Sequence, residues 1–238
     1  MFRIDRCDPA FEALLDTLLP RFIGDTVTQE PFGVSVESDW NVREVLDCIL
    51  KTHSDCLWIR SACLIAPDGR TVLIAGRSGS GKSTTACGLA LGYGWKVVSE
   101  DVVLIDFGQR KIIPFASPFS LKWDTMQLVR DALGSLPDVN LQGEWLPMTG
   151  ELIATEIDAR FDISILLDFV YPHTVELQFS ELNSSELLRK LLPLSNALQI
   201  PESCEKLMAL LDGGSCFCIH GGTPQHRFEK MLQLVEPL

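Results

Sequence analysis

The sequence contains no cluster of lysine and arginine residues and no apolar stretch of membrane-spanning length. Nucleic-acid-binding domains usually carry a basic patch, and a membrane-spanning helix needs about 20 mostly apolar residues. We therefore expect neither a nucleic-acid nor a membrane partner. The segment MFRIDRCDPAFEALL also lacks the apolar centre of a signal peptide, so a cytoplasmic protein is expected.

Positive charge is scarce: 20 lysines and arginines stand against 32 aspartates and glutamates, which gives a net charge of −12. Such acidity favours solubility or a basic partner. The 238 residues, 46% of them hydrophobic, suffice for one large domain with a buried core. We expect residues 1–58 to form an N-terminal helix and strand extension packed on a main domain of residues 59–238.

Internal repeats are absent, and the eight cysteines are not placed like a disulfide framework. In a cytoplasmic chain we expect reduced thiols. Cys216, Cys218 and His220 alternate along a strand-like segment, so their side chains would share one face. With His226 as a fourth ligand they are a candidate zinc site, but a half-buried strand is the preferred interpretation.

Residues 76–83, Gly-Arg-Ser-Gly-Ser-Gly-Lys-Ser, match the pattern G-x-x-x-x-G-K-[ST] of a phosphate-binding loop. Glycines permit positive φ angles, so the loop can turn several N–H groups into one concavity suited to phosphate oxygens. An apolar run at 71–75 precedes the loop and a helical segment follows it, as the motif requires. Lys82 can reach the β- and γ-phosphates, and the Ser83 hydroxyl can bind Mg²⁺.

The loop therefore predicts a site for ATP and Mg²⁺. Arg77 and Ser80 stand at variable positions of the pattern, so their side chains receive no separate role. The residues that we expect to line the nucleotide are Gly76, Ser78, Gly79, Ser80, Gly81, Lys82, Ser83 and Thr84.

An acidic pair follows about one helix length later, where GWKVVSEDVV places Glu100 and Asp101 after a short predicted strand. One carboxylate can bind the metal, and the other can accept a proton from an attacking hydroxyl. A polar turn would have the same composition. A competing assignment puts the metal on Asp106, which ends an apolar run like a Walker B aspartate. We prefer the acidic pair, because Asp106 also starts the turn sequence DFGQR.

Turn sequences between apolar runs predict an α/β fold with a mixed β-sheet and flanking helices. Pro67-Asp68-Gly69-Arg70 predicts a β-hairpin that feeds the loop, and FGQR predicts a second hairpin. Hairpin strands are antiparallel, whereas parallel strands need long crossovers, so the sheet should contain both. Further predicted strands are 32–38, 161–169, 173–179 and 215–220; predicted helices are 8–19, 41–53, 184–192, 202–211 and 223–235, the last capped by Thr223; and 134–151 is expected to be a loop.

The first hairpin, the loop and GWKVVSEDVV, in this order and near this spacing, resemble the HPr kinase/phosphorylase group, which is related to phosphoenolpyruvate carboxykinase. The resemblance covers residues 61–115. It implies a phosphate-loop core of that type and an enzyme that uses ATP and Mg²⁺ to phosphorylate a serine hydroxyl on a protein. Carried over, Lys82 and Ser83 take the loop roles, Asp101 is the catalytic base, and Glu100 is the first acidic position, beside the metal.

Two departures from the family concern its reverse, phosphorylase reaction. Ser61 stands where the bifunctional enzymes begin the hairpin with a histidine. The segment FASPFSLKWDTM has no metal-binding glutamate, only Lys122 and Asp124, and both departures argue against that reaction. Lys122 is a weak candidate for steadying the transferred phosphoryl group, and an exposed lysine without a role fits equally well.

Together with the resemblance, which implies the serine acceptor, the residues predict an ATP-dependent serine kinase whose catalytic residues are Asp101, Glu100 and Lys82. The short N-terminal region resembles small stand-alone relatives, some of which phosphorylate a serine of a ribosomal precursor peptide such as a lasso precursor. A small-molecule kinase or carboxykinase-like enzyme would share every loop residue, and a non-catalytic ATP-binding regulatory module would retain the loop. The acceptor stays open, as does assembly into a homo-oligomer.

Overall fold

The computed structural model describes residues 2–5, 32–35, 56–114, 119–120, 123–134, 145–146, 157–168 and 176–235. The helices predicted over 8–19 and 41–53, and Lys122, lie outside these ranges. Near the N-terminus β1 (Phe2–Asp5) and β2 (Phe32–Ser35) pair in parallel, which confirms the first four residues of the strand predicted at 32–38; its last three lie outside the described ranges. Within the described ranges no helix combines the length and apolar character needed to cross a membrane.

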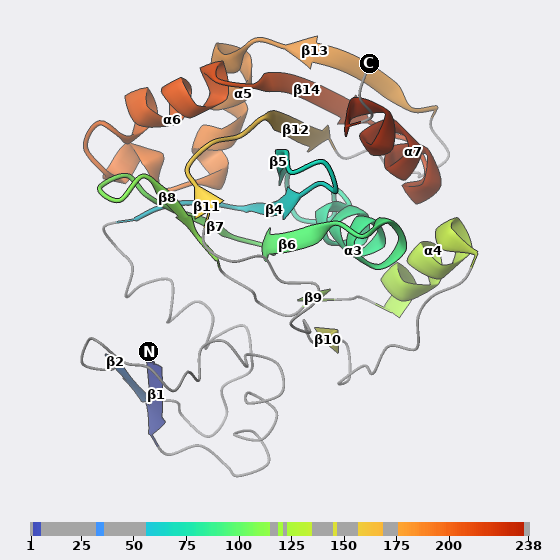
Figure 1. Ribbon diagram of the computed structural model, residues 1–238, viewed down its shortest axis with the longest axis horizontal. Helices are drawn as coiled ribbons and strands as arrows, with labels where there is room; N and C mark the ends of the chain where they lie inside the picture. Colours follow the sequence, from blue (N-terminus) through green and yellow to red (C-terminus); the bar gives the residue numbers. More distant parts are fainter. Residues whose placement is uncertain are drawn as a thin grey trace.

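A six-stranded mixed sheet forms the centre of the fold (Figure 1). Its strand order is β13-β14-β12-β5-β4-β6. Because β4 is antiparallel to both β5 and β6, and β12 and β14 are parallel to β5, four strands run one way and β4 and β13 run the other. The predicted mixed sheet is confirmed. The bounds are β4 (Ser61–Ile65), β5 (Thr71–Ala75), β6 (Lys96–Ser99), β12 (Ile163–Asp168), β13 (Gln178–Leu182) and β14 (Ser215–His220).

The second predicted hairpin forms as β7 (Val103–Asp106) and β8 (Lys111–Ile113), but in a separate antiparallel sheet of order β11-β8-β7-β3. That sheet is completed by β3 (Leu57–Ile59) and β11 (Ile157–Asp158). A further short pair joins β9 (Phe119–Ser120) to β10 (Trp145–Leu146), so a strand lies within the segment expected to be a loop.

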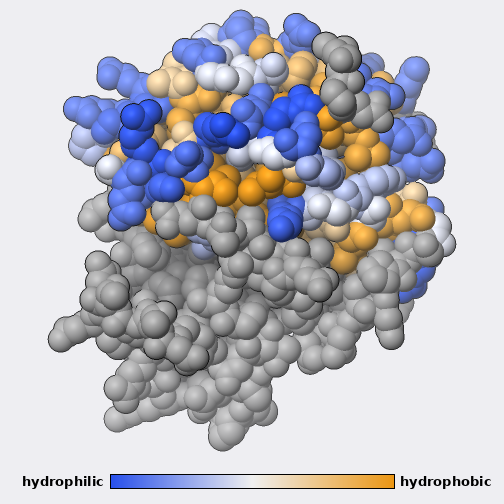
Figure 2. Space-filling model, viewed as in Figure 1, coloured by the Kyte–Doolittle hydropathy of each residue, from blue (hydrophilic) through white to orange (hydrophobic). Residues whose placement is uncertain are grey.

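Helices and the second sheet cover opposite faces of the central sheet (Figure 1). One face packs against α3 (Lys82–Tyr93), α4 (Trp123–Leu133) and α7 (Pro224–Val235). The other packs against α5 (Ser184–Leu191), α6 (Ser203–Asp212) and the second sheet, with the short 3₁₀ turns η1 (Leu192–Leu194) and η2 (Ala197–Gln199) between them. On the described part of the surface, Figure 2 shows hydrophilic side chains with apolar ones between them.

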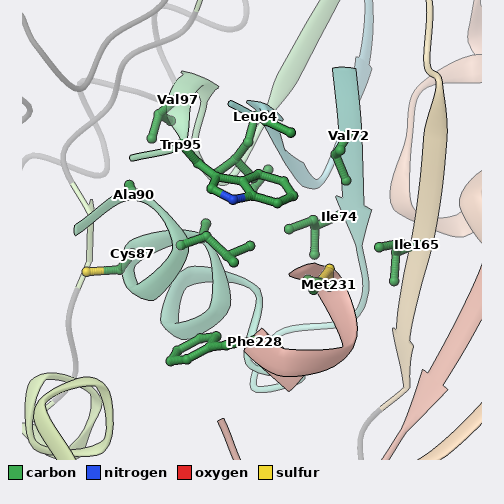
Figure 3. Close-up of a cluster of buried hydrophobic side chains, with 14 of the residues drawn as sticks. Leu64, Val72, Ile74, Cys87, Ala90, Trp95, Val97, Ile165, Phe228 and Met231 are labelled. Carbon is green, nitrogen blue, oxygen red and sulfur yellow. The ribbon is translucent and has the colours of Figure 1, made fainter. Parts of the chain in front are cut away.

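Strand alternation divides the core between these two faces. On β5, Val72 and Ile74 face α3 and α7, while Leu73 and Ala75 face the second sheet. Figure 3 shows Phe228 and Met231 of α7 reaching toward α3 and β5. The Phe228 ring lies so close to Gly88 of α3 that a β-carbon there would overlap it. Glycine thus lets α7 pack closely against α3. Since α3 starts directly after the phosphate loop, α7 lies in the same helical layer.

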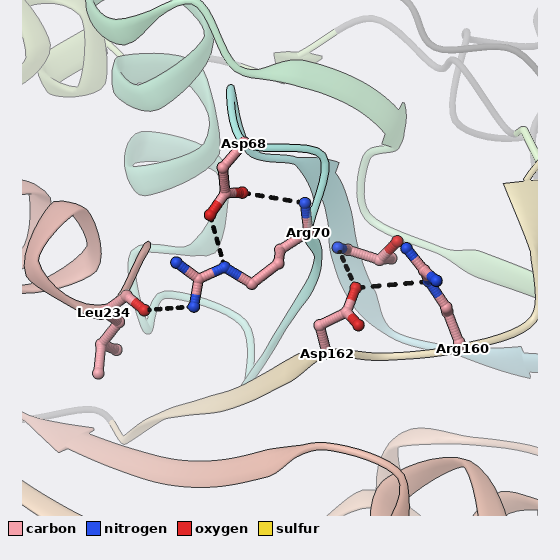
Figure 4. Close-up of polar contacts among 6 residues, drawn as sticks. Asp68, Arg70, Arg160, Asp162 and Leu234 are labelled. Atoms are coloured by element: carbon pink, nitrogen blue, oxygen red, sulfur yellow. Dashed lines mark hydrogen bonds and ion pairs between the residues drawn. The ribbon is translucent and has the colours of Figure 1, made fainter. Parts of the chain in front are cut away.

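Both ends of α7 are fixed by polar contacts. Thr223 caps the first turn, where its hydroxyl accepts a hydrogen bond from His226 N at 3.3 Å, as predicted. At the other end, Arg70 donates to the Leu234 carbonyl at 3.0 Å and pairs with Asp68 at 2.6 Å, as Figure 4 shows. The turn of the first hairpin is therefore tied to the C-terminal end of α7.

Candidate functional site

Four parallel strands of the central sheet end at one edge, and each is followed there by a polar segment. The phosphate loop follows β5, and Glu100 follows β6. Asp168 and His220 end β12 and β14. The antiparallel β4 begins at the same edge with Ser61. Ligands of open α/β sheets bind outside the carboxyl ends of the strands, so this edge is the candidate site.

The loop has the geometry that its glycines predict. Gly79 and Gly81 have φ angles of 83° and 92°, which glycine adopts without strain. A β-carbon at Gly76 would lie 2.5 Å from the Leu167 carbonyl oxygen, so the loop can leave β5 only with glycine there. Ser78 and Gly79 are exposed, and α3 starts directly after Gly81. The loop therefore presents its backbone at the sheet edge.

Lys82 lies beneath the loop and is only 8% exposed. Its Nζ donates to the Arg77 carbonyl at 3.3 Å, so the lysine bridges the two ends of the loop. Burial lowers the pKa of Lys82, and the charge of Arg60 adds to this, while the carboxylates of Asp101 and Glu100 raise it. The carboxylates of Glu100 and Asp101 are thus both close enough to Lys82 to affect its pKa.

Ser83 and Glu100 meet directly, although 17 residues separate them. The Ser83 hydroxyl donates to Oε1 of Glu100 at 2.5 Å, and Glu100 is 2% exposed. A hydroxyl and a carboxylate are both oxygen ligands of the kind that Mg²⁺ prefers. This donor set fits the predicted metal, and these are the two residues predicted to hold it. Thr84, one residue later, is half-buried in the first turn of α3.

A β-bulge in β6 directs Glu100 toward Ser83. Cys63 pairs with Ser99 and Leu64 with Val97, so Val98 is an extra residue in β6. Val98 and Ser99 then both oppose Cys63, and the alternation of faces resumes one residue later. Glu100 consequently points to the face of the sheet that α3 covers.

Asp101 has a different environment from Glu100. Its φ of 62° lies in the left-handed region, and its carbonyl accepts a hydrogen bond from Ser61 N at 3.0 Å. Its carboxylate lies 3.9 Å from the guanidinium of Arg60, and the two side chains are 38% and 48% exposed. Asp101 is therefore accessible from solvent, as a proton acceptor for an incoming hydroxyl must be. Sequence reasoning did not find Arg60.

Asp106 starts a turn, as the preferred assignment supposed. Its Oδ1 accepts a hydrogen bond from Gln109 N at 2.9 Å. It ends β7, which belongs to the second sheet and begins two residues after Asp101. Asp106 is therefore separated from Glu100 and Asp101 by the whole length of β7.

Two features near the loop were not expected from the sequence. Arg227 of α7 is buried and its guanidinium donates to the Ser80 carbonyl at 2.6 Å. His220 Nδ1 lies 3.5 Å from Asp168 Oδ2 at the ends of two neighbouring strands. The sequence does indicate that Arg227 is unusual. It lies on the face of α7 that also contains Phe228 and Met231, where apolar residues are expected.

The segment with Cys216, Cys218 and His220 is a half-buried strand, β14, as preferred. Across the ranges that the structure describes, no group of three or more His, Cys, Asp or Glu residues has the arrangement of a metal site. Burial raises the pKa of both thiols, so the strand holds them in their protonated form.

A pocket of about 530 Å³ lies at the opposite edge of the sheet from the loop, between the starts of α5 and β14. Ser215 in its wall pairs with Ile163 at the start of β12, whereas the loop lies beyond the end of β12. Glu181 and Asp212 line it, and two carboxylates oppose phosphate binding. We therefore assign nucleotide binding to the loop and not to this pocket.

Comparison with known proteins finds no matching family model and no matching curated protein. Among solved structures, the Hpr(Ser) kinase/phosphatase from Coxiella burnetii is similar to this chain, with 12% sequence identity and a TM-score of 0.35. The match covers 74% of this chain and 98% of that one. At this identity and TM-score the likeness carries no argument about function, which is therefore derived from the site.

Proposed function

We propose that this chain is an ATP- and Mg²⁺-dependent kinase that phosphorylates a serine hydroxyl of a protein or peptide, with residues 59–238 as its kinase domain. The observation that carries the proposal is the unequal placement of the two acids. Glu100 is buried against the Ser83 hydroxyl, whereas the Asp101 side chain is partly exposed, at 38%. One carboxylate is placed for a metal and the other for an acceptor.

The residues of the site divide the reaction between them. The loop amides and Lys82 bind the phosphates. Ser83 and Glu100 are the residues that would hold Mg²⁺, which would offset negative charge on the phosphates. Asp101 takes the proton of the serine hydroxyl. The serine oxygen forms a bond to the γ-phosphorus, the bond from that phosphorus to its bridging oxygen breaks, and ADP leaves with the electron pair.

Arg60 has a supporting role in this proposal. Its guanidinium lies 3.9 Å from the Asp101 carboxylate, so it holds the base at the mouth of the site before the acceptor arrives. The serine acceptor itself is suggested by the resemblance to the HPr kinase group, and a peptide by the small stand-alone relatives. An acceptor that approaches Asp101 from solvent is consistent with a protein or peptide chain.

The test is transfer from γ-labelled ATP to HPr-like proteins, ribosomal precursor peptides and small hydroxy compounds. Asp101→Asn keeps the shape of the side chain and removes the proton acceptor, so single-turnover transfer should fall by about 10²–10⁴-fold. ATP affinity should be nearly unchanged, because the phosphate contacts come from the loop. Asp106→Asn is the matched control, and asparagine serves equally well as a turn starter.

Each other outcome identifies a different function. A silent Asp101→Asn together with an impaired Asp106→Asn would show that Asp106 is the metal ligand and would overturn the mechanism. Transfer only to small compounds would make the chain a small-molecule kinase. ATP binding without transfer or hydrolysis would make it a regulatory module.

A further inference from the structure

Arg227 joins α7 to the phosphate loop across 147 residues of sequence. One guanidinium nitrogen donates to the Ser80 carbonyl at 2.6 Å, and Nε donates to the Gly221 carbonyl at 2.9 Å. The residue is only 7% exposed, between the loop and the turn that precedes α7. Bonds from a charged donor to buried carbonyls are stronger than neutral ones, so Arg227 holds the Ser80 carbonyl in one direction.

We propose that Arg227 is a positioning residue that sets the direction of the Gly81 amide in the phosphate loop. The carbonyl of Ser80 and the N–H of Gly81 belong to the same trans peptide, in which the two bonds point in opposite directions. Because Arg227 fixes the carbonyl on the α7 side, the Gly81 N–H faces away from α7. Fixed amides of this loop are the groups that bind phosphate oxygens, so the arginine prepares the loop for the nucleotide without touching it.

The close fit at Gly81 supports this role. A β-carbon at Gly81 would overlap the Arg227 guanidinium. The glycine therefore meets two demands, a φ of 92° and room for the arginine. The Ser80 hydroxyl is also buried, and no hydrogen-bond partner for it exists among the described residues. The Arg227 guanidinium is thus the side-chain donor that the Ser80 residue has among the described residues, and it bonds to the carbonyl.

A purely structural role would be to satisfy carbonyls and stabilise α7, and Arg70 supplies a matched control for it. Arg70 also donates to a backbone carbonyl at one end of α7, that of Leu234 at 3.0 Å (Figure 4). Its hydrogen-bond and ion-pair partners among the described residues, Asp68, Leu234 and Ala66, all lie outside the loop. If Arg227 acts only through the stability of α7, the two arginines should behave alike.

The experiment compares Arg227→Gln, Arg227→Lys and Arg70→Gln in the full chain; it rests on the proposed nucleotide site. ATP affinity is measured by calorimetry below the unfolding midpoint of each variant. Arg227→Gln should weaken ATP binding by about 10-fold or more, the usual worth of a lost charged hydrogen bond. Arg227→Lys should lose less, and Arg70→Gln should retain wild-type affinity whatever melting temperature it loses. KM for ATP should rise while kcat at saturating ATP is largely kept, because Asp101 is untouched.

Wild-type ATP affinity in folded Arg227→Gln would overturn the inference, and so would an equal loss of affinity in Arg70→Gln. If Arg227→Gln does not fold, Arg227→Lys decides by the same criteria. Failure of the proposed function is separable, because a wild-type chain that binds ATP but transfers no phosphate would overturn only the kinase. A wild-type chain that binds no ATP would overturn both.

Discussion

Replacement of Glu100 by glutamine tests whether the Ser83 and Glu100 pair binds the metal. The substitution keeps the size of the side chain and removes one negative charge. In the structure this carboxylate is 2% exposed and accepts a hydrogen bond from the Ser83 hydroxyl at 2.5 Å. Because the carboxylate is buried, solvent screens its charge only weakly, and a metal bound there would feel the loss of that charge strongly.

The expected loss follows from that burial. We take the lost contact between the carboxylate and the metal to be at least as large as a charged hydrogen bond, about 1.5–3 kcal/mol, and each 1.4 kcal/mol is about a factor of ten in affinity. We expect Glu100→Gln to raise the Mg²⁺ concentration needed for half-maximal ATP binding by about 10–150-fold. The variant should still bind ATP at saturating Mg²⁺, because the loop and Lys82 are unchanged.

The assay is a Mg²⁺ titration of ATP binding, followed by calorimetry or a fluorescent ATP analogue. Glu229→Gln, the same change at an exposed position of α7, is the control and should titrate like the wild type. Ser83→Ala should cause a similar shift, and the double variant should cost less than the sum, since the two residues share one ligand. An unchanged Mg²⁺ requirement in Glu100→Gln would refute the metal assignment.

Two further predictions concern Lys82 and Phe228. Burial lowers the pKa of Lys82 and nearby phosphates raise it, so ATP binding should take up a proton and weaken as pH rises from the lowered pKa toward the usual value of about 10.4. Calorimetry in two buffers of different ionisation enthalpy measures this uptake, and Lys82→Met should show none. Phe228 is fully buried against Gly88, so Phe228→Ala should lower the free energy of unfolding by about 3–5 kcal/mol. Leu198→Ala, at a residue 76% exposed, should change it by less than about 0.5 kcal/mol in urea unfolding, and equal effects would contradict the packing described here.

The first hairpin, the phosphate loop and α7 could be predicted from the sequence, because each depends on residues close together in the chain. Pro67-Asp68-Gly69-Arg70 gives a turn, and Thr223 with Pro224 begins a helix, whatever the rest of the chain does. The loop pattern likewise needs only its own residues and the strand before it. These elements formed within a few residues of the predicted bounds.

Contacts between distant segments could not be predicted in the same way. The hairpin of β7 and β8 pairs with β3 in its own sheet, and the apolar pattern of a strand does not identify its neighbour. Arg60 and Arg227 have no local motif, since their roles come from partners 41 and 147 residues away. The meeting of Ser83 and Glu100 was expected, but not that one acid would be buried and the other exposed.

The bulge in β6 determines which face of the sheet the acid after this strand points to, and the sequence of the Glu-Asp pair does not show this. If β4 and β6 paired without Val98 as an extra residue, Ser61 would lie opposite Glu100 and not Asp101. The Glu100 side chain, which directly follows β6, would then point to the other face of the sheet, away from Ser83. One extra residue in β6 therefore decides whether a carboxylate reaches the phosphate loop, and a chain with the same Glu-Asp pair but no bulge would turn its glutamate away from the loop.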